Sequence, residues 1–292
     1  MRNETPPLKE ARRFVSKGRV QTGKKEERNE RMKIGFLGAG KMAEGILSAI
    51  ADKKSVVMAE KLPERREYLA KKHGVAVIAS LAEAVKKSRL VFLAVRPQDV
   101  DAVASEVKPL LAEKHVLVSI VAGKSLSRLR KAFGGKAGLV RVMPNLALRA
   151  SAGMSAVCAA KGTDERTVKE VVKILSGAGE AVILKEKDFD AVTALSGSGP
   201  AYFAYMAEAM MEGGVKLGLK KDVALLLAMQ TMYGTAKFLR ENDVPLKTFI
   251  EGVCTKGGTT AAGMVKMDVP AFKKIVAETL AAAAARSKEL GK

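Results

Sequence analysis

Three threonines and two glycines gather within one short stretch of the C-terminal part of the sequence: Thr255, Gly257, Gly258, Thr259 and Thr260. A helical pattern follows directly, so several backbone N–H groups and hydroxyls can face one point. Such a cluster is suited to bind an anion, for example a carboxylate. An ordinary helix cap is the simpler interpretation, but a cap would explain one threonine and one glycine and not the whole cluster.

A second glycine-rich stretch lies near the start of the chain and reads Gly38-Ala39-Gly40-Lys41-Met42-Ala43. It follows a short apolar strand at 33–37 and precedes a helical pattern at 45–50, which is the context of a dinucleotide-binding turn. Gly38 permits the tight turn and Gly40 lets the backbone approach a pyrophosphate. The helix that follows points its positive end at the phosphates. The predicted contacts are Gly38, Gly40, Lys41 and Met42.

An acidic residue follows the next predicted strand, at 56–59. Glu60 stands 22 positions after Gly38, where an acid normally accepts hydrogen bonds from a ribose 2′-hydroxyl and disfavours a 2′-phosphate, which favours NAD. Lys61, Arg65 and Arg66 follow, and they either hold a 2′-phosphate or are solvated charges on the next helix. The residues alone leave both dinucleotides open.

Two further apolar runs of strand length, at 90–95 and 116–120, are typical of a parallel sheet covered by helices on both faces. Ligands of such sheets lie beyond the carboxyl ends of the strands, so residues 95–98 and 122–124 are predicted at the cofactor crevice. A plain strand-ending turn is the alternative for Arg96 and Pro97. The candidates at this edge are Ala94, Val95, Arg96, Pro97 and, after another short strand, Asn145.

The C-terminal part has the pattern of helices. Residues 200–219 predict a long helix that Ser198 or Gly199 caps, with Pro200 in its first turn. The rest of that helix is apolar apart from one narrow charged stripe, and it is too short and too interrupted for a membrane span, so it is predicted to be wrapped by other helices. Further helices are predicted at 222–241, 245–252 and 270–290.

Bulk properties narrow the class of protein. With 292 residues, 48% hydrophobic, the chain is long enough for two domains. The net charge of +20 is scattered and aromatics make up only 4%, so an anionic substrate and cofactor explain it better than nucleic acid. Two cysteines and two distant histidines give no disulfide framework and no metal-ligand spacing, and they fit a reducing cytoplasm. Residues 1–31 have the composition of a dispensable, disordered basic tail.

Several of these stretches resemble one family. Residues 194–202 and 213–219 closely resemble the central helix of pyrroline-5-carboxylate reductases, the enzymes that make proline. Residues 94–98 resemble the family's Ala-Val-Lys-Pro-Gln segment, and Met143-Pro144-Asn145 its Met-Pro-Asn segment. The stretch 253–264 resembles the signature Thr-Ser-Pro-Gly-Gly-Thr-Thr. The resemblance runs from Met32 to the C-terminus.

The resemblance implies an α/β protein, with a Rossmann-type doubly wound domain at 32–190 and an all-α dimerisation domain at 191–292. It implies that NADPH, or alternatively NADH, reduces the C=N bond of 1-pyrroline-5-carboxylate to L-proline in a homodimer or a multiple of it. Asn145 would lie at the nicotinamide end. Thr255 would contact the substrate carboxylate and Thr260 would be the hydroxyl nearest the imine nitrogen. No His, Asp or Glu lies between Val253 and Val265, so the proton comes from a hydroxyl, a water or the substrate itself.

Some residues depart from the family pattern: Leu146 replaces a hydroxyl, and Gly252, Cys254 and Lys256 differ in and beside the threonine cluster. A related imine or hydroxyacid reductase would explain Leu146, although residues 196–211 contain no lysine, which such hydroxyacid enzymes have on the chemical face of the central helix. A protein that senses dinucleotides without catalysis would keep the first glycine turn and have no reason to keep the threonines. Both alternatives stay open on the sequence.

Overall fold

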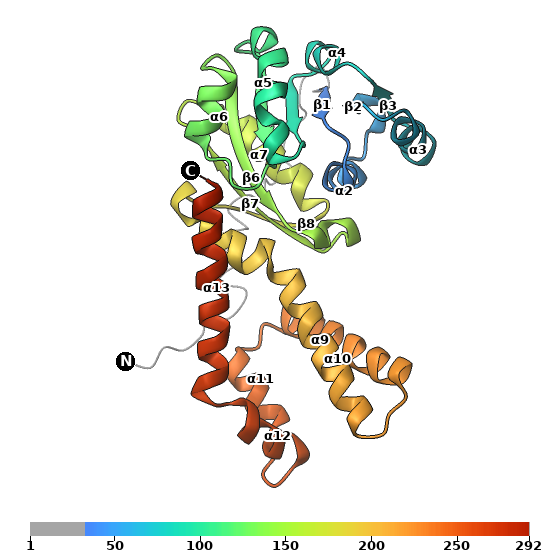
Figure 1. The fold of residues 1–292 in the computed structure, drawn as a ribbon, viewed down its shortest axis with the longest axis vertical. Helices are drawn as coiled ribbons and strands as arrows, with labels where there is room; N and C mark the ends of the chain where they lie inside the picture. Colours follow the sequence, from blue (N-terminus) through green and yellow to red (C-terminus); the bar gives the residue numbers. More distant parts are fainter. Residues whose placement is uncertain (1–32, 292) are drawn as a thin grey trace, which may run out of the picture. The chain divides into compact units, whose positions relative to one another are not determined.

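The computed structural model describes residues 33–291, and the predicted tail at 1–31 lies outside that range. The described chain divides into two compact units (Figure 1). The sheet unit contains residues 33–197 and 283–291, and the helical unit contains residues 198–282. The segment 191–197 groups with the sheet by its contacts. The assignment of domains at 32–190 and 191–292 stays a prediction.

The sheet unit is built on eight strands in the order β3-β2-β1-β4-β5-β6-β7-β8. Strands β1 to β6 are parallel, β7 is antiparallel to β6, and β8 is parallel to β7. The chain builds outward from β1 in one direction and then from β4 in the other, so the switch of order lies between β1 and β4. The strands are β1 Ile34–Leu37, β2 Val56–Ala59, β3 Ala76–Ile78, β4 Leu90–Leu93, β5 Val116–Ser119, β6 Gly138–Pro144, β7 Gly153–Ala159 and β8 Gly179–Ile183.

Helices cover both faces of this sheet, which explains why β1, β2, β4 and β5 are buried along their whole length. Phe36 and Phe92 stack with ring centroids 4.8 Å apart in the core on one face. Leu37 and Leu93, the next residues of the same strands, enter the core on the other face. The first face carries α2 Lys41–Ala49, α3 Pro63–His73 and α7 Glu165–Ser176, and the second carries α4 Leu81–Lys86, α5 Val100–Val107 and α6 Leu126–Phe133.

The helical unit begins with an antiparallel pair, α9 Gly199–Lys216 and α10 Lys221–Asn242. Gly214 lets the two helices approach, because a Cβ added there would lie 3.1 Å from the Cβ of Ala224. Gly218, with φ +96°, turns the chain between them. The remaining elements are α11 Leu246–Val253, α12 Thr259–Met267 and the part of α13 Pro270–Leu290 up to residue 282.

The predicted cap of α9 is wrong. Pro200 lies in the first turn as expected, but Ser198 has helical backbone angles, φ −85° and ψ −22°, and its side chain caps nothing. The reason is that the backbone is already helical upstream, through α8 Phe189–Val192 and a π-helical turn, Thr193–Gly197. A helix that continues from a preceding one leaves no free N–H groups for a cap to satisfy.

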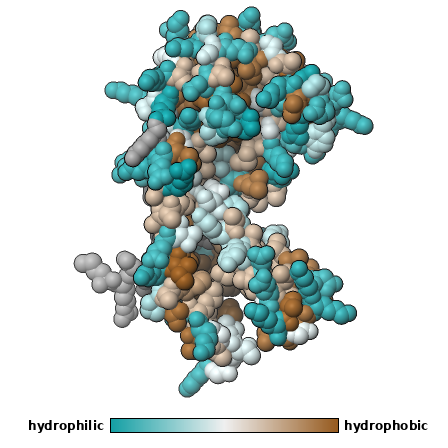
Figure 2. Space-filling model, viewed as in Figure 1, coloured by the Kyte–Doolittle hydropathy of each residue, from teal (hydrophilic) through white to brown (hydrophobic). Residues whose placement is uncertain are grey.

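The predicted wrapping of α9 by other helices of the chain is also incomplete. Along α9 and α10 the side chains that are buried include Ala207, Met211, Ala224 and Ala228, whereas Phe203 is 64% exposed and Leu226 67%. Apolar side chains therefore reach the surface of the helical unit (brown in Figure 2). None of the helices within residues 33–291 has the length and apolar character to span a bilayer.

Candidate dinucleotide and substrate sites

The first glycine turn lies at the carboxyl edge of the parallel strands, next to the switch between β1 and β4. Gly38 has φ +91° and its N–H donates to the carbonyl of Ala59, 3.0 Å away. A Cβ at this position would lie 2.6 Å from the carbonyl oxygen of Ala94 and 3.0 Å from Val95 Cγ1. Any residue except glycine would therefore clash. The turn and the segment after β4 come together as the sequence indicates.

The space above Gly40 is open, because no atom lies within 4 Å of a Cβ built there. Gly40 is also the N-cap residue of α2, and no side chain caps the helix. The first N–H groups of α2, among them those of Lys41 and Met42, therefore have no capping side chain over them, and the positive end of the helix dipole is there. This cradle fits the pyrophosphate of a dinucleotide.

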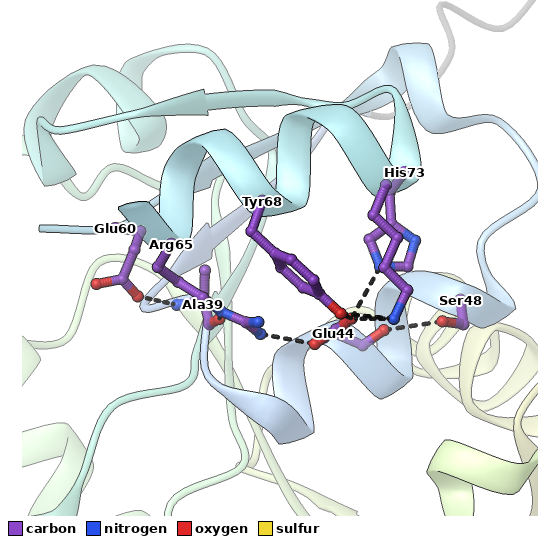
Figure 3. Close-up of polar contacts among 8 residues, drawn as sticks. Ala39, Glu44, Ser48, Glu60, Arg65, Tyr68 and His73 are labelled. Atoms are coloured by element: carbon purple, nitrogen blue, oxygen red, sulfur yellow. Dashed lines mark hydrogen bonds and ion pairs between the residues drawn. The ribbon is translucent and has the colours of Figure 1, made fainter. Parts of the chain in front are cut away.

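Glu60 lies beside this turn. Its carboxylate accepts hydrogen bonds from the backbone N–H of Ala39, at 3.2 Å, and of Leu62, at 3.1 Å (Figure 3). The backbone of Glu60 continues the sheet edge, since its N–H donates to the carbonyl of Ile78. The acid after the second strand is thus at the place where a ribose 2′-hydroxyl is bound in such folds.

The basic residues after Glu60 divide into two kinds. Arg65 donates from Nε to the Ala39 carbonyl at 3.0 Å and from Nη2 to Glu44 Oε2 at 2.7 Å. Arg66 donates to the backbone carbonyls of Glu60 and Lys61. The side chain of Lys61 is exposed. The two arginines are therefore engaged in hydrogen bonds to backbone carbonyls and to the Glu44 carboxylate. Of the three basic residues, Lys61 is the one whose side chain is exposed to solvent.

Glu44 is a residue that sequence analysis missed. It is buried in α2, and it is surrounded by side chains of α3: besides Arg65, Lys72 Nζ and His73 Nε2 each lie 3.0 Å from Oε1, and the hydroxyl of Tyr68 lies 3.4 Å away. Burial alone would raise the pKa of Glu44, but the hydrogen bonds from His73, Arg65 and Lys72 outweigh it and lower the pKa from 4.5 to about 2. Glu44 is therefore ionised throughout the physiological range. The spacing of Arg65, Tyr68 and Lys72 along one helix face was the available signal.

Arg96 in the segment after β4 is exposed, whereas Gly123 in the segment after β5 is covered by the end of α13. Arg96 pairs with Asp99 in its own turn, Nε to Oδ2 at 2.9 Å, and Pro97 starts that turn. Gly123, with φ +71°, is covered by the end of α13, because a Cβ there would lie 3.1 Å from Leu290 Cβ. The expectation that residues 122–124 line the crevice overlooked this packing of the C-terminal residues on the sheet unit.

Asn145 directly follows β6, and both the nitrogen and the oxygen of its side-chain amide make hydrogen bonds. Nδ2 donates to Ser196 Oγ at 3.3 Å, and Oδ1 accepts from the N–H of Met154 at 3.1 Å. Leu146, the departure from the family pattern, is 53% exposed, whereas Leu148 is buried against Gly45 and Gly153. Leu146 therefore replaces the hydroxyl residue of the family pattern at a surface position directly after Asn145.

The threonine cluster forms the entry to α12 in the helical unit. Gly257 has φ +75°, and the N–H of Gly258 donates to the carbonyl of Thr255 at 2.9 Å, which closes a tight turn. Gly258 is the N-cap residue and no side chain caps α12. The ordinary helix cap therefore consists of Gly258 alone and does not use the threonine side chains. Thr259 and Thr260 begin the helix, and its first N–H groups are left for an anion.

The two sets of candidate residues fall in different units: the dinucleotide set in the sheet unit, and the threonine set in the helical unit. Within residues 33–291, no group of three or more His, Cys, Asp or Glu side chains is arranged to hold a metal ion. A doubly wound sheet with a glycine turn and an uncapped helix start at its carboxyl edge, followed by a helical unit, is the architecture of dinucleotide-dependent oxidoreductases.

Comparison with known proteins gives the particular family. The family model for pyrroline-5-carboxylate reductase dimerisation matches residues 186–290, and the model for NADP oxidoreductase, coenzyme F420-dependent, matches residues 33–123. Pyrroline-5-carboxylate reductase of Synechocystis is 37% identical over 266 residues, 89% of this chain and 99% of that protein. The enzyme of Arabidopsis thaliana is 35% identical over 89% of this chain and 96% of its own. The chain belongs to the pyrroline-5-carboxylate reductase family.

Solved structures agree with this. The pyrroline-5-carboxylate reductase of Coxiella burnetii has a TM-score of 0.86 at 28% identity, covering 90% of this chain and 100% of that one. The pyrroline carboxylate reductase of Plasmodium falciparum, solved with NADP bound, has a TM-score of 0.79 at 29% identity, covering 90% and 99%.

Proposed function

We propose that this protein is a pyrroline-5-carboxylate reductase, which reduces the ring C=N bond of 1-pyrroline-5-carboxylate to give L-proline. The observation that carries the proposal is the presence of both halves of the required site in one chain of this family: the open cradle above Gly40 and the uncapped start of α12 at Thr259. When bound, NAD(P)H supplies the hydride that the carbon of the C=N bond receives.

The sheet unit would hold the dinucleotide. We assign the pyrophosphate to the turn at Gly38 and Gly40 and to the first N–H groups of α2, because no side chain caps this helix and the space above Gly40 is open. The adenosine ribose belongs with Glu60 and Lys61 after β2. The remaining contacts are Ala94, Val95, Arg96, Pro97 and Asn145, which follow the carboxyl ends of β4 and β6.

The helical unit would hold the substrate. We assign the carboxylate to the turn at Thr255, Gly257, Gly258 and Thr259, with Thr255 as the hydroxyl that touches it. Thr260 is assigned to the imine nitrogen, which takes up a proton as the carbon becomes saturated. The support is the same uncapped helix start, together with the exposure of Thr255 and Thr259.

Substrate profiling tests this proposal. Purified protein with NADPH or NADH should oxidise the dinucleotide when pyrroline-5-carboxylate is added, and it should do so far more slowly with a 2-oxoacid, the substrate that a hydroxyacid dehydrogenase reduces. Turnover of the 2-oxoacid at a comparable kcat/KM would assign the chain to the hydroxyacid branch. Dinucleotide binding without turnover of either compound would favour a sensor.

We propose further that the protein is a homodimer or a multiple of it, formed through α9 and α10. Both helices carry exposed apolar side chains, Phe203, Tyr205, Leu226 and Tyr233 among them, and this region lies within the match to the dimerisation model. An apolar face of this kind is stable in water only when another surface covers it. Light scattering at micromolar concentration should give the mass of a dimer or a multiple, and a monomer would contradict the proposal.

A cytoplasmic location is the last part of the proposal. It is supported by two free cysteines, Cys158 and Cys254, and burial raises the pKa of Cys158 to about 12, with Glu186 adding to the effect, so that this thiol is protected from oxidation. Cell fractionation should find the protein with cytoplasmic markers.

We assign the positive charge of the chain to the binding of small anionic ligands rather than nucleic acid. Salt-dependent retention of the protein on DNA at physiological ionic strength would contradict this assignment.

A further inference from the structure

The middle residue of the dinucleotide turn is held on both of its backbone groups. The N–H of Ala39 donates to Glu60 Oε2 at 3.2 Å, and its carbonyl accepts from Arg65 Nε at 3.0 Å (Figure 3). Its neighbours in the turn are glycines, which by themselves leave the turn many conformations. The orientation of the peptide groups between Gly38 and Gly40 is therefore determined by these two side chains.

Arg65 is itself held in place. Its Nη2 lies 2.7 Å from Glu44 Oε2, and its guanidinium carbon lies 5.0 Å from the centre of the Tyr68 ring. The side chain of Glu44 is 9% exposed and that of Arg65 is 23% exposed, so this ion pair is shielded from solvent. A shielded, charge-assisted hydrogen bond restricts a side chain more than a surface pair does. Glu44 thus links α2 and α3 and aims Arg65 at the turn.

These contacts leave Arg65 poorly suited to another role. Nε and Nη2 are already used, on a backbone carbonyl and on a carboxylate that is ionised at neutral pH. To reach a 2′-phosphate, the guanidinium would have to give up its hydrogen bond to Glu44 Oε2 in a place shielded from water, which is costly. Lys61 follows Glu60 directly and is exposed, so it can reach a ligand without breaking a contact of this kind.

We propose that Glu44 and Arg65 are positioning residues for the dinucleotide, and that Lys61 rather than Arg65 distinguishes NADPH from NADH. This inference rests on the proposed dinucleotide site at the first glycine turn. Arg65, oriented by Glu44, fixes Ala39 so that the turn presents its N–H groups in one arrangement. Because NADPH and NADH share the pyrophosphate, the pair supports both equally.

The test is a comparison of dissociation constants for the two dinucleotides, measured by fluorescence titration on the full chain. Arg65→Ala should weaken NADPH and NADH by the same factor, about tenfold, which is the loss of roughly one hydrogen bond to a charged group. Lys61→Ala should weaken NADPH and leave NADH unchanged. An Arg65→Ala variant that loses affinity for NADPH alone would overturn the proposal, since it would make Arg65 the phosphate ligand.

A second variant separates positioning from general stability. Glu44→Gln should also weaken both dinucleotides, and the double variant with Arg65→Ala should be no worse than Arg65→Ala alone, because Glu44 acts through Arg65. Lys72→Gln is the matched control. It removes another cation from Glu44 without touching the turn, so both dissociation constants should stay at the wild-type values. Equal weakening by Lys72→Gln would show that the effect is one of stability and would contradict the proposal.

A further variant shows whether the site itself is correctly assigned. Gly40→Val puts a side chain into the open space above the turn, where no atom of the described chain lies within 4 Å of its Cβ. It should abolish binding of both dinucleotides while the melting temperature is kept. If Gly40→Val bound them normally, the assigned site would be wrong. If Gly40→Val lost binding while Arg65→Ala and Glu44→Gln kept it, only the positioning inference would fail.

Discussion

The sheet unit buries its apolar side chains within itself, and the helical unit does not. Phe36 and Phe92 are fully buried and stacked between helices of the same unit, whereas Phe203 and Leu226 face outward from α9 and α10. The sheet unit therefore covers its apolar side chains with its own residues, whereas the helical unit requires a second surface to cover its exposed faces.

The largest effect is expected from truncating one phenylalanine in each unit. Phe36→Ala should destabilise the protein by about 3–5 kcal/mol, since it removes a fully buried ring and leaves a cavity. Phe203→Ala should cost less than about 1 kcal/mol in the chain itself, but it should raise the dissociation constant of the dimer. Urea unfolding at several protein concentrations measures both. A concentration-independent loss of the same size in Phe203→Ala would remove the distinction between the units.

The second effect is acid sensitivity centred on Glu44 in the sheet unit. The pKa of the Glu44 carboxyl is about 2 in the folded protein, compared with 4.5 for an ordinary glutamate. A lowered pKa contributes stability that is fully present above pH 4.5 and is lost as the pH falls toward 2. The shift corresponds to about 3 kcal/mol. The stability difference between wild type and Glu44→Gln should therefore shrink across this window, as measured by urea unfolding at each pH. A difference independent of pH would contradict the assigned ion pairs.

The third effect concerns the threonine cluster of the helical unit. Thr260→Ala should lower kcat by ~10²-fold, the usual loss of a positioned proton donor. The dissociation constants of NADPH and NADH should not change, because the dinucleotide set lies in the other unit. Thr255→Ala serves as the matched control and should mainly raise the KM for pyrroline-5-carboxylate. A near-normal kcat in Thr260→Ala across the pH range would leave the cluster as a carboxylate site only.

The smallest effect concerns the choice of dinucleotide by the sheet unit. Glu60→Ser removes a negative charge near the position of the 2′-phosphate and should shift the ratio of kcat/KM toward NADPH by about fivefold, a typical value for a solvent-screened charge. Both dinucleotides should also bind somewhat less tightly, because the hydrogen bond to Ala39 is lost. An unchanged ratio would place the selectivity elsewhere.

The sequence was sufficient for features that depend on neighbouring residues. The buried strands β1, β2, β4 and β5 are continuous apolar runs, and the turn at Gly38 follows the first of them, so each is visible in a short window. Pro270 and the alanine-rich run likewise define α13.

Features that depend on residues far apart could not be predicted. The Glu44 site needs α3 to lie beside α2, and the antiparallel direction of β7 beside β6 depends on how two separate strands pair. The cap at Ser198 failed because the preceding turn is π-helical, a state that propensity does not distinguish from a loop. For α9, the apolar pattern shows that the surface of the helix must be covered but not by which chain.

The packing of the end of α13 on the sheet unit affects the order in which the protein can fold. Ser287 Oγ donates to Asp190 at 2.7 Å, and Leu290 covers Gly123, so residues 283–291 complete the sheet unit after the chain has passed through the whole helical unit. The helical unit is therefore an insertion within the sheet unit. During synthesis, residues 33–197 emerge first and must wait for this final piece. A fragment that ends at residue 197 lacks residues 283–291, whereas a chain in which a flexible linker joins residue 197 to residue 283 would contain them.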